Sequence, residues 1–343
     1  MGYGVVFLFL QSWSFWQYFV KDSGCISERR GQLSGISQGC TLSPLLFIIA
    51  MSVLLHDVVG MLGTDAREEY RKGNLSDLVY ADDTLLMGVS DVSLAGYLSA
   101  VYTAGRQYGM ELHWGKFQLV STSCQSYAIP APEGNSICTQ DSIEYLGAIL
   151  RGNGQSHSEV NRRIALARAD FRTLCKVWSH SSLTWKGKLK VFTALVESKL
   201  LYSLAAFSLG VAEQRRLNGF QNRCIRTILG IKSAYLSRIS NKTVLEKACH
   251  PAATDMLRKR RLQLFGKVLR SPENHPLHTA CFIPGTFVPA TDRFVRRVGR
   301  PCREWVREMV ADAVSLFGSM AQAKELAKQK ATWNEILFKR LGC

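Results

Sequence analysis

Two adjacent aspartates, Asp82 and Asp83, lie between two short apolar runs, Leu78 to Ala81 and Leu85 to Val89. Carboxylates held between apolar strands are costly unless a cation lies against them. Their oxygens suit Mg²⁺, which keeps waters and substrate phosphates as its other ligands. Two such ions about 4 Å apart would stabilise the attacking and leaving oxygens of a displacement at phosphorus. An ordinary solvated Asp-Asp turn would have the same two residues, so the pair needs support from its surroundings.

The apolar runs on both sides of the pair predict a hairpin of buried strands with the acids at its tip. A helix is the competing interpretation, but the lack of other polar residues favours strands. Upstream, a Gly-rich turn from Gly35 to Pro44 leads into an apolar run from Leu45 to Leu55. This run predicts a buried helix with Ser43 as its N-cap, ending near Gly60.

The rest of the chain divides into a mixed half and a helical half. The charged stretch from Gly60 to Asn74 predicts a loop, and Glu111 to Val120 and Ile143 to Leu150 predict strands. The apolar stripe that begins at Val160 has the helical period, with Arg168 and other arginines outside it. The predicted helices are Ser93 to Tyr108, Val160 to Trp178, Trp185 to Leu209, Glu213 to Leu229 and, as an amphipathic helix, Arg303 to Arg340.

The N-terminal segment from Val5 to Val20 is apolar but does not have the features of a signal peptide or membrane span. It lacks a basic lead-in and a cleavage site, it is short, and Gln11 and Gln17 interrupt it. We therefore expect a buried helix and no membrane partner. The helix would start without a cap, so we also expect the chain to begin inside a domain.

Charge is divided unevenly along the 343 residues, whose formal net charge is +16. Residues 1–160 contain 9 Lys and Arg against 15 Asp and Glu, and residues 161–343 contain 34 against 12. A basic half of this size predicts a polyanionic partner, most often nucleic acid. An acidic half that handles the same partner needs neutralising cations. The apolar content excludes a disordered tail, and the composition excludes collagen and a disulfide scaffold.

The ten cysteines show no short paired spacing. We therefore expect reduced thiols and a nuclear or cytoplasmic protein that is not secreted.

Several segments together carry a resemblance to a known family. Gly35-Ile36-Ser37-Gln38-Gly39 and the following residues up to Phe47 resemble motif B of reverse transcriptases of non-LTR (LINE-type) retrotransposons, and Tyr80-Ala81-Asp82-Asp83 resembles their motif C. Gly109 to Lys116 is similar to motif D, Tyr145-Leu146-Gly147 to the motif E primer grip, and Arg163 to Trp178 to the start of the thumb.

The resemblance implies an α+β fold: a partial right-hand polymerase palm, an antiparallel sheet with helices, over residues 1–155. A mainly α-helical thumb would follow over 156–245 and a basic helical, nucleic-acid-binding C-terminal region over 246–343. The implied activity is RNA-directed DNA synthesis by two-metal nucleotidyl transfer with Mg²⁺ or Mn²⁺. The implied partners are an RNA template, a DNA primer or target, and deoxynucleoside triphosphates.

The resemblance also implies roles for single residues. Asp82 and Asp83 would be the catalytic metal ligands, and Gly35, Gln38 and Gly39 would let template and nucleotide approach the backbone. Lys116 would lie near the triphosphate, and Tyr145, Leu146 and Gly147 would hold the primer end. Outside this context the glycines are a plain turn, Lys116 is a surface lysine, and Tyr145 to Gly147 belong to a core strand.

One part of the family pattern has no counterpart here. The motif A aspartate would lie upstream of Gly35, where Asp22 is the single aspartate and lies in a predicted loop. Two-metal transfer needs this third carboxylate. We therefore expect a chain truncated before motif A and inactive alone, with a possible upstream segment of the same element missing. An exposed sheet edge and poor solubility would follow.

A second class of function needs no catalysis. The basic clusters around Arg258, Lys259, Arg260 and Arg261 and around Arg296 and Arg297 could bind nucleic-acid phosphates by themselves, with strong salt dependence. The alternative is therefore a non-catalytic nucleic-acid-binding remnant or a domesticated protein that uses its basic C-terminal half.

Overall fold

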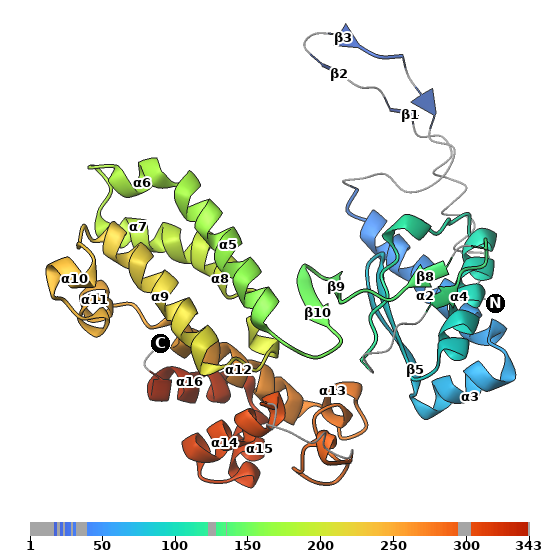
Figure 1. The fold of residues 1–343 in the computed structure, drawn as a ribbon. Helices are drawn as coiled ribbons and strands as arrows, with labels where there is room; N and C mark the ends of the chain where they lie inside the picture. Colours follow the sequence, from blue (N-terminus) through green and yellow to red (C-terminus); the bar gives the residue numbers. More distant parts are fainter. Residues whose placement is uncertain are drawn as a thin grey trace. The chain divides into compact units, whose positions relative to one another are not determined.

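The computed structural model describes residues 17–18, 21–22, 25–28, 30–31, 40–122, 128–134, 136–293 and 303–341. The chain divides into two compact units, residues 1–147 and 148–343 (Figure 1). Each unit has its own hydrophobic core, and each is described by itself.

In its described residues, the first unit packs the three helices α2, α3 and α4 with a two-stranded hairpin. Its core residues come from α2, α3, β5 and α4, with Leu54, Val58, Leu75, Tyr97 and Ala104 among those that are buried. The elements of this unit are the short strands β1 (Gln17–Tyr18), β2 (Lys21–Asp22), β3 (Cys25–Ile26) and β4 (Arg30–Gly31), then α2 (Ser43–Met61), α3 (Thr64–Lys72), β5 (Leu75–Tyr80), β6 (Asp83–Gly88), α4 (Asp91–Gln107), the 3-10 turn η2 (Trp114–Lys116), β7 (Ala128–Pro130), β8 (Ser136–Cys138) and β9 (Ser142–Tyr145).

The hairpin of β5 and β6 is antiparallel and pairs Tyr80 with Asp83, so Ala81 and Asp82 form a two-residue turn. The expected hairpin is confirmed. The expected burial of its strands is wrong, because the end of β5 is exposed, with Tyr80 at 65%. The helices cover the other end, where Leu75 is buried.

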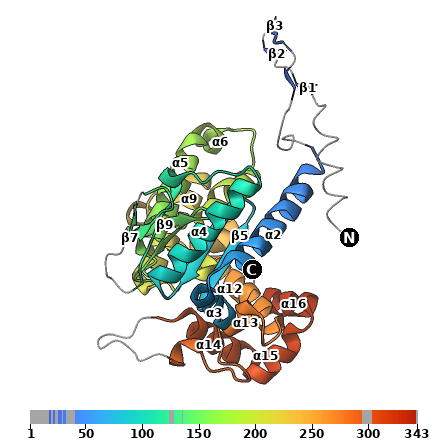
Figure 2. The same cartoon turned by 90° about the vertical axis from the view of Figure 1, so that its right-hand side faces the viewer.

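Helix α2 confirms the helix expected after the Gly-rich segment, with Pro44 in its first turn. The expected N-cap is wrong, because Leu42 and not Ser43 holds that position. It is not a buried helix over its whole length. Leu54 and Val58 are buried and α4 packs against α2 (Figure 2), but Leu45 and Ile48 are more than half exposed. Among the described residues, Ser43–Met61 is the helix whose length and composition would allow it to cross a membrane. A soluble core helix meets the same test, so the absence of a membrane partner stays a prediction.

The loop expected before the hairpin is wrong. The predicted loop between Gly60 and Asn74 contains helix α3, which Lys72 stabilises through a 2.9 Å ion pair with Glu68 one turn earlier. Gly73 ends the helix in the left-handed conformation (φ 75°), for which glycine has no steric cost.

The predicted strand from Glu111 to Val120 is instead the turn η2, followed by a single bridge at Leu119. Trp114 stacks on Phe117 with ring centroids 5.0 Å apart, and this contact three residues along the chain favours a turn over an extended strand. At the other end of the unit, the described residues Gln17 and Tyr18 are in a strand and not in the helix expected from Val5 to Val20.

The described part of the second unit is helical apart from the strand β10 (Ala148–Arg151). The other elements of the second unit are α5 (His157–Thr173), α6 (Cys175–Ser179), α7 (Trp185–Val191), the π-helix η3 (Phe192–Glu197), α8 (Ser198–Leu200), η4 (Leu204–Ala206), α9 (Val211–Ile228), α10 (Ala234–Ser237), α11 (Asn241–Ala248), α12 (Ala253–Arg270), α13 (Pro276–Thr279), η5 (Ala290–Arg293), α14 (Trp305–Phe317), α15 (Met320–Ala327) and α16 (Lys330–Leu341). The apolar stripe that begins at Val160 confirms α5, and α9 is the helix expected from Glu213, with Gly210 directly before it.

Helix α12 joins the two cores of this unit. Ala253 and Leu257 belong to a core built with α5, η3 and α9, and Leu262 and Phe265 belong to a second core built with α14, α15 and α16 (Figure 1). The single amphipathic helix expected from Arg303 to Arg340 is wrong. Gly318 adopts a positive φ of 88° and ends α14, so three shorter helices fold around α12.

The fold is therefore mixed α+β, mostly helical, with small antiparallel sheets.

Candidate active site and basic surfaces

The two sequence-predicted metal ligands lie at the tip of the β5–β6 hairpin. Asp82 is the second turn residue and Asp83 is the first residue of β6, and both are exposed. The two carboxylates therefore belong to consecutive residues at the exposed tip of the hairpin. A phosphate-bearing substrate could reach them there.

The tip carries backbone strain. Ala81 has a φ of 55°, in the left-handed region that costs a residue with a Cβ atom about 1 kcal/mol or more. The turn between β9 and β10 has the same property, because Leu146 has a φ of 48° and Gly147 a φ of 70°. Such strained turns are concentrated at functional sites, which favours a role for both hairpin tips.

Tyr145 connects these two parts of the first unit. Its hydroxyl donates a hydrogen bond of 3.2 Å to the carbonyl oxygen of Leu78 in β5, 67 residues earlier in the chain. Partial burial and the nearby negative charge of Asp83 raise the pKa of the Tyr145 phenol. The fold therefore brings Tyr145, for which a primer-grip role is predicted, to the aspartate hairpin. Leu146 and Gly147 follow it in the turn.

Lys116 is exposed at the end of η2. The segment that follows it is fixed to β9, because the side-chain oxygen of Gln118 accepts a hydrogen bond of 2.8 Å from the backbone N–H of Glu144. Lys116 is therefore two residues before Gln118, whose side chain is hydrogen-bonded to β9, the strand that ends at Tyr145.

The two carboxylates at the hairpin tip fit Mg²⁺ as part of its coordination shell and not as a complete protein cage. The described residues contain no group of three or more His, Cys, Asp or Glu side chains that could enclose a metal ion. Two exposed carboxylates are nevertheless what Mg²⁺ takes from a protein when waters and substrate phosphates complete its coordination. Asp82 and Asp83 suit an ion that arrives with a nucleotide.

The basic cluster on α12 has internal partners. Arg258 forms a two-pronged ion pair with Asp312, at 2.9 and 3.2 Å, and Arg261 is buried and lies 2.6 Å from Glu308. Lys259 lies over the ring of Phe338. Arg260 is half-buried and has no hydrogen bond or ion pair with the described residues. The predicted role of the four residues in phosphate binding stays a prediction.

The remaining predicted site residues lie outside the described residues. They are Gly35, Gln38 and Gly39 of the Gly-rich segment, and Arg296 and Arg297.

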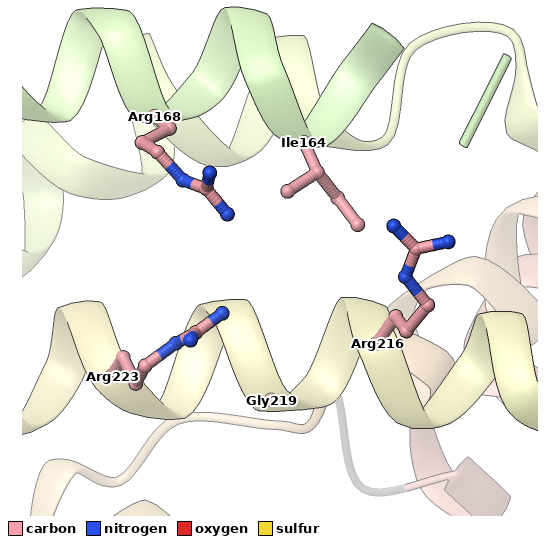
Figure 3. A pocket seen from close by; sticks show the side chains of 5 residues that line it. All are labelled: Ile164, Arg168, Arg216, Gly219 and Arg223. Carbon is pink, nitrogen blue, oxygen red and sulfur yellow. The ribbon is translucent and has the colours of Figure 1, made fainter. Parts of the chain in front are cut away.

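A second basic feature was not predicted from the sequence. It is a groove of about 290 Å³ between α5 and α9 (Figure 3). Arg168 lines it from α5, and Arg216 and Arg223 line it from α9. The signal was present in the sequence, since Arg216, Gly219 and Arg223 follow the spacing of three and four residues that places side chains on one helix face.

The arrangement defines a mixed α+β unit with paired carboxylates at a strained hairpin, followed by a basic helical unit. Residues 7–150 match the reverse transcriptase (RNA-dependent DNA polymerase) family. The matched stretch includes Asp82, Asp83, Lys116 and Tyr145, so the resemblance is confirmed for residues 7–150 at the level of the reverse transcriptase family. No curated protein matches the sequence.

Proposed function

We propose that this chain carries the palm segment of a LINE-type reverse transcriptase, in which Asp82 and Asp83 bind Mg²⁺ or Mn²⁺ together with an incoming deoxynucleoside triphosphate. The observation that supports this most is the hairpin with both carboxylates at its exposed tip, inside the stretch that matches the reverse transcriptase family. The family implies an RNA template and a DNA primer as further partners.

The chain's own residues would divide the work as follows. Asp82 and Asp83 supply carboxylate oxygens at the reacting phosphate. Tyr145, fixed to the same hairpin through Leu78, positions the primer end, and exposed Lys116 contributes positive charge toward the triphosphate. The bound metal would lower the cost of the negative charge that develops at phosphorus.

We further propose that the 343-residue chain alone does not extend a primer. Two-metal transfer needs a third carboxylate to bridge the ions, and Asp22 is the single aspartate that precedes Gly35 in this sequence. Purified chain with Mn²⁺ or Mg²⁺, an RNA template and a DNA primer should therefore give no extension above the Asp82→Ala variant. Robust extension by the unchanged chain that disappears in Asp82→Ala would contradict this proposal. It would mean that the chain alone is an active polymerase.

Metal binding tests the hairpin without relying on activity. Titration of Mn²⁺ by electron paramagnetic resonance, with and without a deoxynucleoside triphosphate, should show tighter binding when the nucleotide is present. Asp82→Asn with Asp83→Asn should remove that gain, and Asp91→Asn, an exposed aspartate at the start of α4, should keep it. Equal binding by all three proteins would contradict a metal site at the hairpin.

A second candidate is nucleic-acid binding without catalysis. It is favoured by the excess of positive charge over residues 161–343 and by the arginine groove between α5 and α9. We propose a nuclear or cytoplasmic location for either function.

A further inference from the structure

The turn η2, which carries Lys116, is anchored on one side by the ring of Trp114. This ring stacks on Phe117 with centroids 5.0 Å apart and lies against Tyr102 of α4 at 5.9 Å. The indole N–H donates a hydrogen bond of 2.6 Å to Oε2 of Glu133. Residues three apart in a 3-10 turn lie above one another, so Trp114 and Phe117 share the anchored face. Lys116 lies on another face and is exposed.

Glu133 reaches the indole from the turn between β7 and β8. The backbone N–H of Gly134 closes this turn with a hydrogen bond of 3.0 Å to the carbonyl oxygen of Ala131, and Gly134 has the positive φ of 82° that glycine tolerates. Ile129 of β7 and Ala131 are buried, and β7 packs against α4. The hairpin therefore presents the carboxylate of Glu133 to Trp114 from a well-packed base.

Lys116 lies between this anchor and a second one. Two residues after it, the side chain of Gln118 accepts the hydrogen bond from the backbone of Glu144 in β9, the strand that ends at Tyr145. Lys116 itself makes no hydrogen bond or ion pair with the described residues. Contacts on both sides thus hold the backbone of Lys116, while its ammonium group has no partner among these residues.

The charge of Glu133 is the wrong sign for a site that takes a triphosphate. A carboxylate near such a site opposes an anion by charge alone. Any favourable effect of Glu133 on triphosphate binding therefore has to come through the hydrogen bond to Trp114. A lysine is a mobile point charge, so its contact with a phosphate oxygen depends on how well neighbouring packing and hydrogen bonds hold its backbone.

We propose that Glu133 and Trp114 are positioning residues, which fix Lys116 for contact with the outer phosphates of a deoxynucleoside triphosphate. They act through the turn η2 and not by contact with the nucleotide. The β7–β8 hairpin, which contains none of the residues predicted for the site, thereby becomes part of the nucleotide-binding machinery. This inference rests on the proposed role of Lys116 at the triphosphate.

The test is binding of a fluorescent deoxyadenosine triphosphate to the intact chain with Mn²⁺, measured by anisotropy, with deoxyadenosine monophosphate as a competitor. Lys116→Gln should lower the triphosphate affinity about tenfold, because it removes a charged contact, and should leave the monophosphate affinity within about twofold. Glu133→Ala and Trp114→Phe should each lower the triphosphate affinity about threefold or more, again with the monophosphate affinity unchanged.

Three comparisons separate position from charge. Glu133→Gln keeps an oxygen that accepts the indole N–H and should bind the triphosphate like the unchanged chain. Glu111→Ala removes another exposed carboxylate of the same unit and should not weaken binding. Glu133→Ala combined with Trp114→Phe should weaken binding no more than either change alone, because both remove the same hydrogen bond. Glu133 is exposed, so the comparison of alanine with glutamine there holds even where Trp114→Phe fails to fold.

The outcomes distinguish this inference from the proposed function. Unchanged triphosphate affinity in Glu133→Ala, together with weaker binding in Lys116→Gln, would overturn the inference and leave the role of Lys116 intact. An equal loss of triphosphate and monophosphate affinity in Glu133→Ala would also overturn it, since a general loosening of the unit has that effect. Unchanged affinity in Lys116→Gln would overturn both the inference and the proposed role of Lys116.

Discussion

Glu197 shows how this protein stabilises a charge in its interior. It is fully buried, accepts a hydrogen bond of 2.7 Å from Gln221, and lies 3.3 Å from the ring of His250. Gln221 also donates to the carbonyl of Pro251 and accepts from the backbone N–H of Ala253, so one polar network links η3, α9 and the start of α12. A buried carboxylate without these partners would be strongly destabilising.

This pair makes stability depend on pH in a predictable direction. Burial alone would lower the pKa of His250, but the hydrogen bond and the charge of Glu197 outweigh burial and raise it. A group whose pKa is raised on folding stabilises the protein below its unfolded value, about 6.5, and this contribution disappears as the pH rises through the folded value.

His250→Gln should therefore cost most stability below about pH 6.5 and progressively less at higher pH. Each unit of the raised pKa corresponds to about 1.4 kcal/mol. Urea unfolding from pH 5.5 to 9 measures this, with His180→Gln at an exposed position as the control. A cost that grows with pH would mean that the ring is neutral in the folded protein.

Tyr145 offers a test of the candidate site that needs neither metal nor substrate. Partial burial and then the charge of Asp83 raise the pKa of its phenol. Asp83→Asn removes the charge and keeps the burial, so the pKa of Tyr145 should fall part of the way to its ordinary value. Nuclear magnetic resonance of ring-labelled tyrosine, assigned with Tyr145→Phe, measures the shift. An unchanged titration in Asp83→Asn would show that the hairpin tip and Tyr145 are too far apart to share a site.

At the scale of elements, one contact determines how closely α12 and α16 approach. A Cβ atom at Gly266 of α12 would lie 2.5 Å from Nε1 of Trp333, which is buried and donates a hydrogen bond of 3.0 Å to the carbonyl of Leu262. Trp333 also stacks on Phe317 of α14. Three helices therefore meet at one indole ring, and the glycine is required by packing.

Gly266→Ala should destabilise the second unit by about 1–3 kcal/mol, because the indole ring would have to move in a closely packed core. Gly219→Ala is the matched control, since it is the same substitution in a helix with open space around it, and it should stabilise by about 0.5–1 kcal/mol. Chemical denaturation of the two variants measures the difference. Equal effects would show that helix propensity alone decides both positions.

The elements also show what could be predicted from the sequence. The hairpin with Asp82 and Asp83 at its tip was predictable, because two apolar runs flank a short polar break. The helix α3 was missed because its charged residues resemble a loop, although the pairing of Glu68 with Lys72 and the terminal Gly73 are helix signals. The exposure of Tyr80 could not be predicted, since apolar composition does not say whether another layer covers a strand.

At the scale of the whole molecule, the uneven division of charge along the chain was predictable. Which arginine side chains lack an ion-pair partner was not. Counting residues indicates a basic second half, whereas whether an arginine is available depends on carboxylates far away in the chain. Arg258 pairs with Asp312 and Arg261 with Glu308 across about 50 positions, while Arg216 and Arg223 have no such partners among the described residues. The face shared by α5 and α9 is therefore a further candidate for phosphate contacts, and the role predicted for the arginines of the tail stays a prediction.

The β5–β6 hairpin has a consequence for how this protein must be handled. In the part of the chain that the structure describes, the hairpin is a two-stranded sheet, and the exposed end of β5 presents apolar side chains at a strand edge that no third strand covers. Such an edge can pair with any extended chain, including a second copy. We therefore expect protein concentration to matter. Dilute solutions should favour the single chain, and concentrated solutions should favour assemblies that pair along the hairpin whose tip holds the two aspartates.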